Sequence, residues 1–396
     1  MKKGALSLLV TLAVTGGVFT FIRSLGPGGV VTSAHLAVPH GTSSLASVLF
    51  AIAVIVVVSR LTGRVFHRVF RQPAVMGEIA AGVLLGPSVL GALAPALQHA
   101  LFSADVTTAL NTVAKLGVVL FMFLVGLELD PRLFRGQERA TWVVSQASIM
   151  VPFLLGSALA LALYGRYAPA GTTFTEFALF LGVSFSVTAF PVLARILSER
   201  QLTQTTPGLV ALGSAAINDA AAWCLLALAS GVATSQVEQA GTTVLATVGF
   251  VMVTFVVVRP LARWLAEREE SRTTDVSPSV LSLVFAVMLL AAVATEAIGI
   301  HALFGAFLFG VVMPSHGRLA EQLRIRTEDV VTVLFLPVFF AFTGLRTSLG
   351  LVDTADDWLM LGAIIGVASL GKLGGSALAA RTAGLSWSDA GTVGIL

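Results

Sequence analysis

A long apolar run, from about Gly208 to Leu228, most constrains what this chain can fold into. About 20 apolar residues in a helix are enough to cross the hydrocarbon core of a bilayer. Inside lipid only helices and closed barrels satisfy their own backbone groups, so the run predicts a membrane helix. Its one acid is Asp219, within Ser214-Ala-Ala-Ile-Asn-Asp-Ala-Ala-Ala-Trp223. An ionisable side chain at membrane depth is costly and by default indicates function. The alternative is a buried acid paired with a base for structural reasons.

The composition extends this interpretation to the whole chain. Hydrophobic residues make up 56% of the sequence and charged residues 11%, whereas soluble domains have about 25% charged residues. The 38 glycines suit close helix packing and broken helices. The formal charge of +3 is small and is not gathered into a patch that would suit nucleic acid. The sequence therefore predicts an all-α polytopic membrane protein, with the lipid bilayer and no nucleic acid among its partners.

The apolar runs predict about 12 transmembrane helices. The first, Ala5 to Ile22, follows Met1-Lys-Lys and resembles a signal peptide or a signal anchor; the lack of a clear small-x-small cleavage site favours a retained helix. The Gly/Ser/Thr-rich residues after it predict an exterior loop. We therefore divide the chain into an N-terminal part, 1–44, and a transmembrane domain, 45–396. The further helices are expected at 45–61, 74–93, 109–129, 141–164, 173–195, 208–230, 240–266, 279–297, 299–313, 328–345 and 355–380, with another starting near Ser386.

The distribution of basic residues supports this layout. If Lys2 and Lys3 lie in the cytoplasm and successive helices alternate in direction, most of the 24 Lys and Arg residues fall on the cytoplasmic side. The positive-inside rule describes this asymmetry. We expect an integral protein of the bacterial-type cytoplasmic (inner) membrane, with its N-terminus in the cytoplasm.

One predicted helix carries a break signal, Ser184-Phe-Ser-Val-Thr-Ala-Phe-Pro191. Pro191 removes a backbone donor and frees a nearby carbonyl. The hydroxyls of Ser184 and Thr188 lie close to it in sequence. Discontinuous helices of this kind form ion sites in secondary transporters, although an ordinary proline kink is the alternative.

Lys372, in Ser369-Leu-Gly-Lys-Leu-Gly-Gly375, is a second charge in the middle of an apolar run. A carboxylate partner would make its burial less costly, and Asp219 is the candidate partner. The alternative is that the long side chain reaches the membrane interface.

Other ionisable residues leave two interpretations open. Glu78 follows Gly77 within a helix, and Glu296 lies near a helix end. Each could line a funnel that leads to the ion site, or pair with a nearby arginine or a helix end. His301 could sense pH, but a single histidine at a helix boundary is more often a packing residue.

Two motifs, Thr188-Ala-Phe-Pro-Val-Leu-Ala-Arg195 and Ala215-Ala-Ile-Asn-Asp-Ala-Ala-Ala-Trp223, resemble those of the monovalent cation:proton antiporter (sodium/hydrogen exchanger) superfamily, in its Kef-like and plant CHX-like branch. The resemblance covers nearly everything from about residue 45 onward. Further matching segments are Arg71-Gln-Pro with Gly77-Glu78, Leu85-Gly-Pro87, Phe123-Leu-Val-Gly-Leu-Glu-Leu129, Ala297-Ile-Gly-Ile-His-Ala-Leu-Phe-Gly-Ala306, and Leu336-Pro-Val-Phe-Phe340 with Gly344-Leu345.

This resemblance implies an inverted-repeat antiporter fold and a homodimer. A dimerisation domain would accompany a mobile core domain, formed by helices at about 141–230 and 355–396. Asp219 matches the ion-binding acid of the family, and Asn218 stands where electrogenic members have Asp. Lys372 matches a basic residue on a later core helix. The chain ends inside the second crossing helix, which we therefore expect to be truncated.

The expected function is secondary active exchange of a monovalent cation, K+ or Na+, for H+ by alternating access. Asp219 would hold either the cation or the proton, and Asn218, Thr188 and Ser184 would add oxygen ligands. We expect no enzyme activity, no cofactor and no metal beyond the transported ion. The alternatives are a cation channel-like or glutathione-independent Kef-type efflux pathway, and an intramembrane protease. A channel would require a continuous polar path, and a protease would require a second catalytic acid or a Ser–His pair.

Overall fold

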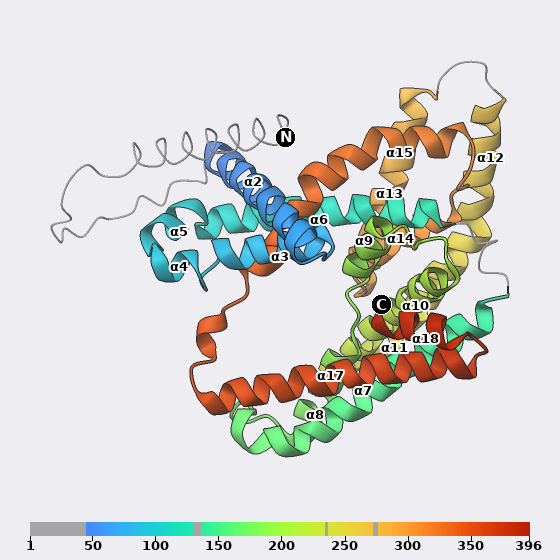
Figure 1. The fold of residues 1–396 in the computed structure, drawn as a ribbon. Helices are drawn as coiled ribbons and strands as arrows, with labels where there is room; N and C mark the ends of the chain where they lie inside the picture. Colours follow the sequence, from blue (N-terminus) through green and yellow to red (C-terminus); the bar gives the residue numbers. More distant parts are fainter. Residues whose placement is uncertain (1–44, 130–135, 234–236, 272–275) are drawn as a thin grey trace. The chain divides into compact units, whose positions relative to one another are not determined.

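The computed structural model describes residues 45–129, 136–233, 237–271 and 276–396, and every regular element in these ranges is helical (Figure 1). The all-α prediction is therefore confirmed. The expected helix from Ala5 to Ile22 lies outside the described residues.

The described ranges contain seventeen α-helices, α2 to α18. In two places a π-helical turn connects one α-helix to the next. They are α2 (Leu45–Val69), α3 (Ala74–Leu85), α4 (Leu90–Leu93), α5 (Pro95–Leu101), α6 (Ala104–Glu128), α7 (Glu138–Tyr167), α8 (Phe174–Ser186), α9 (Phe190–Glu199), α10 (Thr206–Ala233), α11 (Val237–Val253), α12 (Arg259–Glu270), α13 (Pro278–Ile298), α14 (Ala302–Val312), α15 (Arg318–Val330), α16 (Leu336–Leu345), α17 (Ala355–Thr382) and α18 (Trp387–Ile395). The π-helical turns are Thr254–Val258, between α11 and α12, and Val331–Phe335, between α15 and α16. Within the ranges described, nine helical stretches are long and apolar enough to cross a membrane.

The predicted ranges and the observed helices differ mainly at their ends. The run predicted at 74–93 stops as α3 at Leu85, because Gly86 is extended and precedes Pro87. The helix predicted at 328–345 begins earlier, at Arg318. Its first turns are polar, so apolar periodicity alone could not locate that start.

One group of helices is packed through glycines that face the backbone of a neighbouring helix. It comprises α2, α3, α6, α13, α14 and α16. A Cβ placed on Gly126 of α6 would lie 2.2 Å from the Phe307 carbonyl oxygen of α14. The reciprocal Cβ on Gly310 would lie 2.3 Å from the Phe123 carbonyl oxygen. Only glycine allows this approach, so the side-chain hydrogens at these positions set the distance between α6 and α14.

A second group is built around α7, which packs along α8, α10 and α17. α18 packs against α17 and α10. Here too small residues allow close contact, since a Cβ on Gly375 of α17 would lie 3.0 Å from the Val151 side chain of α7. α9 contacts α10 and also α3 and α6 of the first group. The packing of α8, α10 and α17 against α7 therefore positions Ser184, Asn218 and Lys372, which these three helices carry.

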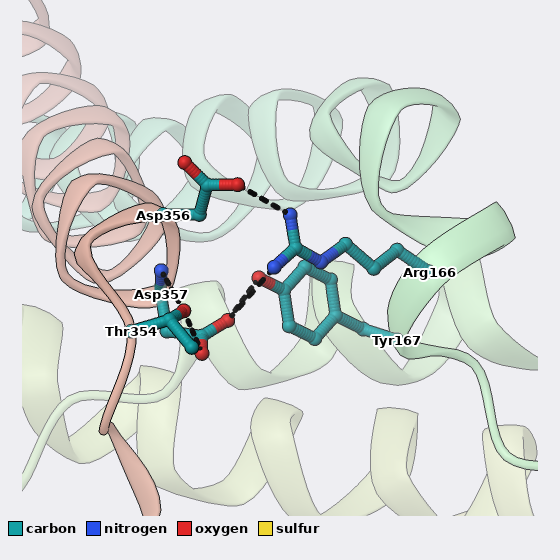
Figure 2. A network of polar contacts seen from close by, with 5 residues as sticks. All are labelled: Arg166, Tyr167, Thr354, Asp356 and Asp357. Atoms are coloured by element: carbon teal, nitrogen blue, oxygen red, sulfur yellow. Dashed lines mark hydrogen bonds and ion pairs between the residues drawn. The ribbon is translucent and has the colours of Figure 1, made fainter.

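The ends of α7 and α17 are joined by a polar network, drawn in Figure 2. Arg166 forms ion pairs with Asp356 at 3.2 Å and with Asp357 at 3.5 Å. Tyr167 Oη donates to Asp357 Oδ1 at 2.7 Å, and the Asp357 backbone N–H donates to Thr354 Oγ1 at 3.2 Å. Exposed ion pairs add little stability, and these contacts connect the end of α7 to the start of α17.

Candidate functional site

The predicted helix break lies between α8 and α9, at residues 187–189. Pro191 has no N–H to give to the Val187 carbonyl. The Phe190 N–H donates to the Thr188 carbonyl at 2.9 Å, so the carbonyl of Ser186 has no helical partner. The interpretation of this segment as a discontinuous helix is confirmed.

Lys372 of α17 binds the end of α8 at this break. Its Nζ donates to the Ser186 carbonyl oxygen at 2.8 Å and also to Thr188 Oγ1. The ammonium group therefore satisfies a carbonyl that the break has freed. The ion pair with Asp219 expected from the sequence is not formed in the described part of the chain. Backbone oxygen at the break takes the place of the carboxylate.

Asn218 of α10 is held by two hydroxyls of α7. Its amide lies 2.7 Å from Ser145 Oγ and 2.6 Å from Ser148 Oγ. With Nδ2 turned toward Ser145, the amide also donates to the carbonyls of Ser214 and Ser145, each at 3.1 Å. Asn218 is 2% exposed, so all of its polar atoms need protein partners. Sequence reasoning missed Ser145 and Ser148; the available signal was two serines three residues apart in an apolar helix, which share one helical face.

A cavity of about 940 Å³ brings three of the four predicted ligands together. Ser184 and Thr188 line it from the broken helix, Asn218 from α10 and Lys372 from α17. The Ser184 hydroxyl donates to the Phe180 carbonyl at 2.7 Å, so its oxygen lone pairs remain available to a cation. Most residues that line the cavity are apolar, and its polar lining consists of hydroxyl and amide groups and the Lys372 ammonium.

Asp219, the fourth predicted ligand, is half-buried on α10 and does not line this cavity. It follows Asn218 directly, and successive residues of a helix point about 100° apart. The Asp219 carboxylate makes no hydrogen bond or ion pair with the residues that the structure describes. Its role as the acid that binds the cation or the proton stays a prediction.

Glu78 belongs to a charged cluster where α3 meets α9. It is 2% exposed, and Arg195, Glu199 and Arg60 are the charged groups near enough to act on it. Arg195 Nε lies 2.8 Å from Glu199 Oε1, and the Ala74 N–H at the start of α3 donates to Glu199 Oε2 at 2.7 Å. Glu78 therefore has an arginine nearby, as its structural interpretation requires, and its role in a funnel stays a prediction.

Glu296 and His301 both act as partners of the α14 N-terminus. Glu296 Oε2 accepts from the Ala302 N–H at 2.8 Å. His301 is the N-cap residue, and its Nδ1 accepts from the Leu303 N–H at 3.4 Å. Both contacts agree with the structural alternative stated for each residue, a partner of a helix end for Glu296 and a packing residue at a helix boundary for His301. A funnel role for Glu296 and a pH-sensing role for His301 stay predictions.

A polytopic membrane protein with a broken helix, freed carbonyls and buried polar groups at that break has the architecture of a secondary transporter. A family model described as "Sodium/hydrogen exchanger, transmembrane" matches residues 53–396. The chain belongs to this family. The family is one of transporters, and the resemblance seen in the motifs is confirmed.

Relatives and a solved structure agree with this assignment. The Na(+)/H(+) antiporter NhaS4 of Synechocystis sp. is 38% identical over 90% of this chain and 87% of its own length. Cation/H(+) antiporter 20 of Arabidopsis thaliana is 38% identical over 87% of this chain, and K(+)/H(+) antiporter 1 of Saccharomyces cerevisiae is 34% identical over 93% of it. The chain spans 42% and 43% of the length of these last two proteins.

The fold is similar to that of the sodium proton antiporter MjNhaP1 from Methanocaldococcus jannaschii at pH 8. The TM-score is 0.57 at 13% identity, over 87% of this chain and 81% of that one. This likeness confirms the antiporter fold predicted from the sequence.

Proposed function

We propose that this chain exchanges a monovalent cation, Na+ or K+, for H+ by alternating access, with Asp219 as the shared binding group. The observation that carries the proposal is a carboxylate on the apolar helix α10 that makes no hydrogen bond or ion pair with a described residue, next in sequence to the amide that lines the cavity at the break. Relatives across most of the chain carry names of Na(+)/H(+) and K(+)/H(+) antiporters.

The cation would bind to oxygens that Asn218, Thr188 and Ser184 supply at the cavity, since hard cations prefer oxygen ligands. Asp219 lies outside this cavity, so we propose that α10 turns during the transport cycle and adds the carboxylate to the same ion. Protonation of Asp219 removes its negative charge and releases the ion. The loaded carrier, with proton or cation, then moves, whereas a bare carboxylate opposes movement through the low-dielectric barrier. One titratable acid leads us to propose one cation for one proton.

Lys372 would regulate access to the same oxygens. Its ammonium group is held by the Ser186 carbonyl and by Thr188 Oγ1, so this oxygen set already favours a positive charge. A cation that enters the cavity competes with Lys372 for Thr188. Lys372 would leave Thr188 when the cation enters and return when the cation is released. The geometry of the broken helix would therefore depend on whether a cation occupies the cavity.

The two helix groups suggest which part moves. We propose that α7, α8, α9, α10, α17 and α18 form the mobile core, and that the glycine-packed group is the scaffold of a homodimer in the cytoplasmic membrane, with the N-terminus in the cytoplasm. Cysteines introduced at Ala74 and Glu199, which a hydrogen bond joins across the α3–α9 contact, can be linked by a cleavable bifunctional thiol reagent, and the link should block exchange until it is cleaved. Undiminished exchange in the fully cross-linked protein would contradict movement at this contact.

The experiment that tests the proposal is exchange by an Asp219→Asn variant reconstituted in vesicles with an imposed pH gradient. Addition of Na+ or K+ should collapse the gradient with wild-type protein and leave it intact with the variant. The matched control is Asp353→Asn, the same change at an exposed loop acid, which should retain exchange. A variant that still dissipates the gradient on addition of salt would refute the role of Asp219.

The channel alternative predicts a different flux. Exchange should saturate with cation concentration and depend on the opposing proton gradient, whereas a channel conducts the cation down its own gradient alone. The second acid of an aspartyl protease is not found beside Asp219 in the described residues, which favours transport over proteolysis.

A further inference from the structure

A basic pocket lies beside the C-terminal half of α2, on a different set of helices from the cavity at the break. It has a volume of about 500 Å³ and is lined by Arg60, Arg64 and Arg68. These arginines are four residues apart, so they share one face of the helix. Ala74, the first residue of α3, lines the pocket as well. We refer to this site as the α2 pocket.

The α2 pocket has an excess of positive charge. Arg64 and Arg68 make no hydrogen bond or ion pair with any residue that the structure describes, and like charges at this spacing repel one another. Arg60 is within electrostatic reach of Glu78, the acid of the lining. Three arginines against one glutamate leave the lining net positive, and His67 adds a further basic group.

Two buried polar atoms in the lining also lack partners. Ser59 is 1% exposed and Glu78 is 2% exposed, yet Ser59 Oγ and Glu78 Oε2 make no hydrogen bond with any residue that the structure describes. Buried polar groups are nearly always hydrogen-bonded, so the Ser59 hydroxyl indicates a missing polar ligand, whereas the Glu78 carboxylate can only accept and does not attract an anion. Ser59 can donate a hydroxyl hydrogen to an anionic oxygen. The Ala74 N–H is already held by Glu199 and is not available to that ligand.

The surroundings of the α2 pocket indicate where its ligand comes from. α2 is a membrane-crossing helix by length and composition. Its apolar side chains Val57, Val65 and Val69 are 40%, 49% and 69% exposed next to the arginines. A ligand that combines an anionic head with apolar chains would cover both kinds of surface. Arginine binds phosphate oxygens bidentately, and basic pockets at the ends of membrane helices accept phospholipid headgroups.

We propose that the α2 pocket is a binding site for the phosphodiester headgroup of an anionic membrane phospholipid, formed where Arg60, Arg64 and Arg68 of α2 meet the buried Ser59 hydroxyl and the start of α3. The phosphate binds Arg64 and Arg68 and accepts from the Ser59 hydroxyl. The acyl chains run along the apolar part of α2 that precedes Arg60, past the exposed Leu49 and Val57. The site adjoins the α3–α9 contact, because Ala74 takes part in both.

The test compares lipid binding to the purified full-length chain, by native mass spectrometry and by thermal stability in detergent with added lipid. Phosphatidylglycerol should remain bound and raise the melting temperature, and phosphatidylcholine at the same concentration should not. The double variant Arg64→Gln, Arg68→Gln should weaken phosphatidylglycerol binding by about tenfold or more, since it removes two charge-assisted contacts. Ser59→Ala should weaken it by a smaller factor.

The matched control is Arg259→Gln, Arg263→Gln on α12. This pair has the same four-residue spacing and also lines a pocket, but that pocket contains Glu267 and Glu270. The control should bind phosphatidylglycerol like wild type. Equal losses in both double variants, or equal binding of the two lipids, would show a diffuse charge effect and overturn the proposal. Inorganic phosphate that stabilises the chain as well as the lipid does would assign the α2 pocket to free phosphate and would also overturn it.

Discussion

The glycine at the crossing of α6 and α14 allows a prediction whose size can be worked from the structure. In Gly126→Ala the new methyl carbon would lie 2.2 Å from the Phe307 carbonyl oxygen and 2.9 Å from the Val311 nitrogen. The first distance is short of ordinary van der Waals contact by more than about 1 Å. Both neighbours are backbone atoms that cannot rotate away, so the helices must separate. Overpacking of this kind costs about 1–3 kcal/mol.

The control is Gly249→Ala on α11, where a Cβ would meet nothing within 4 Å. Alanine in place of a helical glycine without a clash is favourable by about 0.5–1 kcal/mol. The two variants have the same composition, so they isolate the packing effect. Thermal unfolding in one detergent should place Gly126→Ala below wild type by about 1–4 °C for a chain of this length, and Gly249→Ala at or above it. Equal melting temperatures for the two variants would refute the argument that backbone contact fixes the α6–α14 distance.

Two further predictions concern the helix break and the amide network. Lys372→Met leaves the Ser186 carbonyl without its partner, so it should lower stability by about 1–3 kcal/mol and change the cation dependence of exchange; an unchanged melting temperature would mean that water replaces the ammonium group at no cost. Asn218→Leu removes the contacts to Ser145 and Ser148 and deprives the buried Ser145 hydroxyl of its partner, at a cost of about 1–2 kcal/mol, whereas the Ser148 hydroxyl can still donate to the Ser145 carbonyl. The triple variant with both serines changed to alanine should recover part of that loss in the same melting assay, and a further loss would contradict the network.

The helix break illustrates what sequence reasoning can reach. Proline removes an N–H and crowds the carbonyl four residues earlier, so Pro191 and the hydroxyls near it in sequence predicted either a kink or a break between α8 and α9. Residue type alone does not decide between the two, since Pro152 lies inside α7 without interrupting it. The partner of Lys372 could not be predicted in that way. The Ser186 carbonyl is free to accept a hydrogen bond from Lys372 only because the backbone of residues 187–189 leaves the helix. Every residue has a backbone carbonyl, so the sequence does not show which one will be free.

Side-chain networks between helices that are far apart in the sequence could not be predicted from the sequence either. Ser145 and Ser148 carry an i, i+3 signal, but the pairing with Asn218 depends on how α7 and α10 are rotated against each other. Glu78 was recognised as unusual, whereas its neighbour Arg195 lies on a helix whose distance from α3 only the fold defines. Arg64 and Arg68 supported the membrane topology as charges counted by side, and their common pocket appears only in three dimensions.

The break between α8 and α9 also has an electrical consequence. Each half-helix has its own macrodipole, equivalent to roughly half a negative charge at the end of α8 and half a positive charge at the start of α9. Lys372 lies at the negative pole, against the Ser186 carbonyl. An arriving alkali ion would be drawn to that same pole, while the opposite pole of α9 repels it. The interrupted backbone thus distinguishes, over a few ångströms, a side that attracts cations from a side that rejects them.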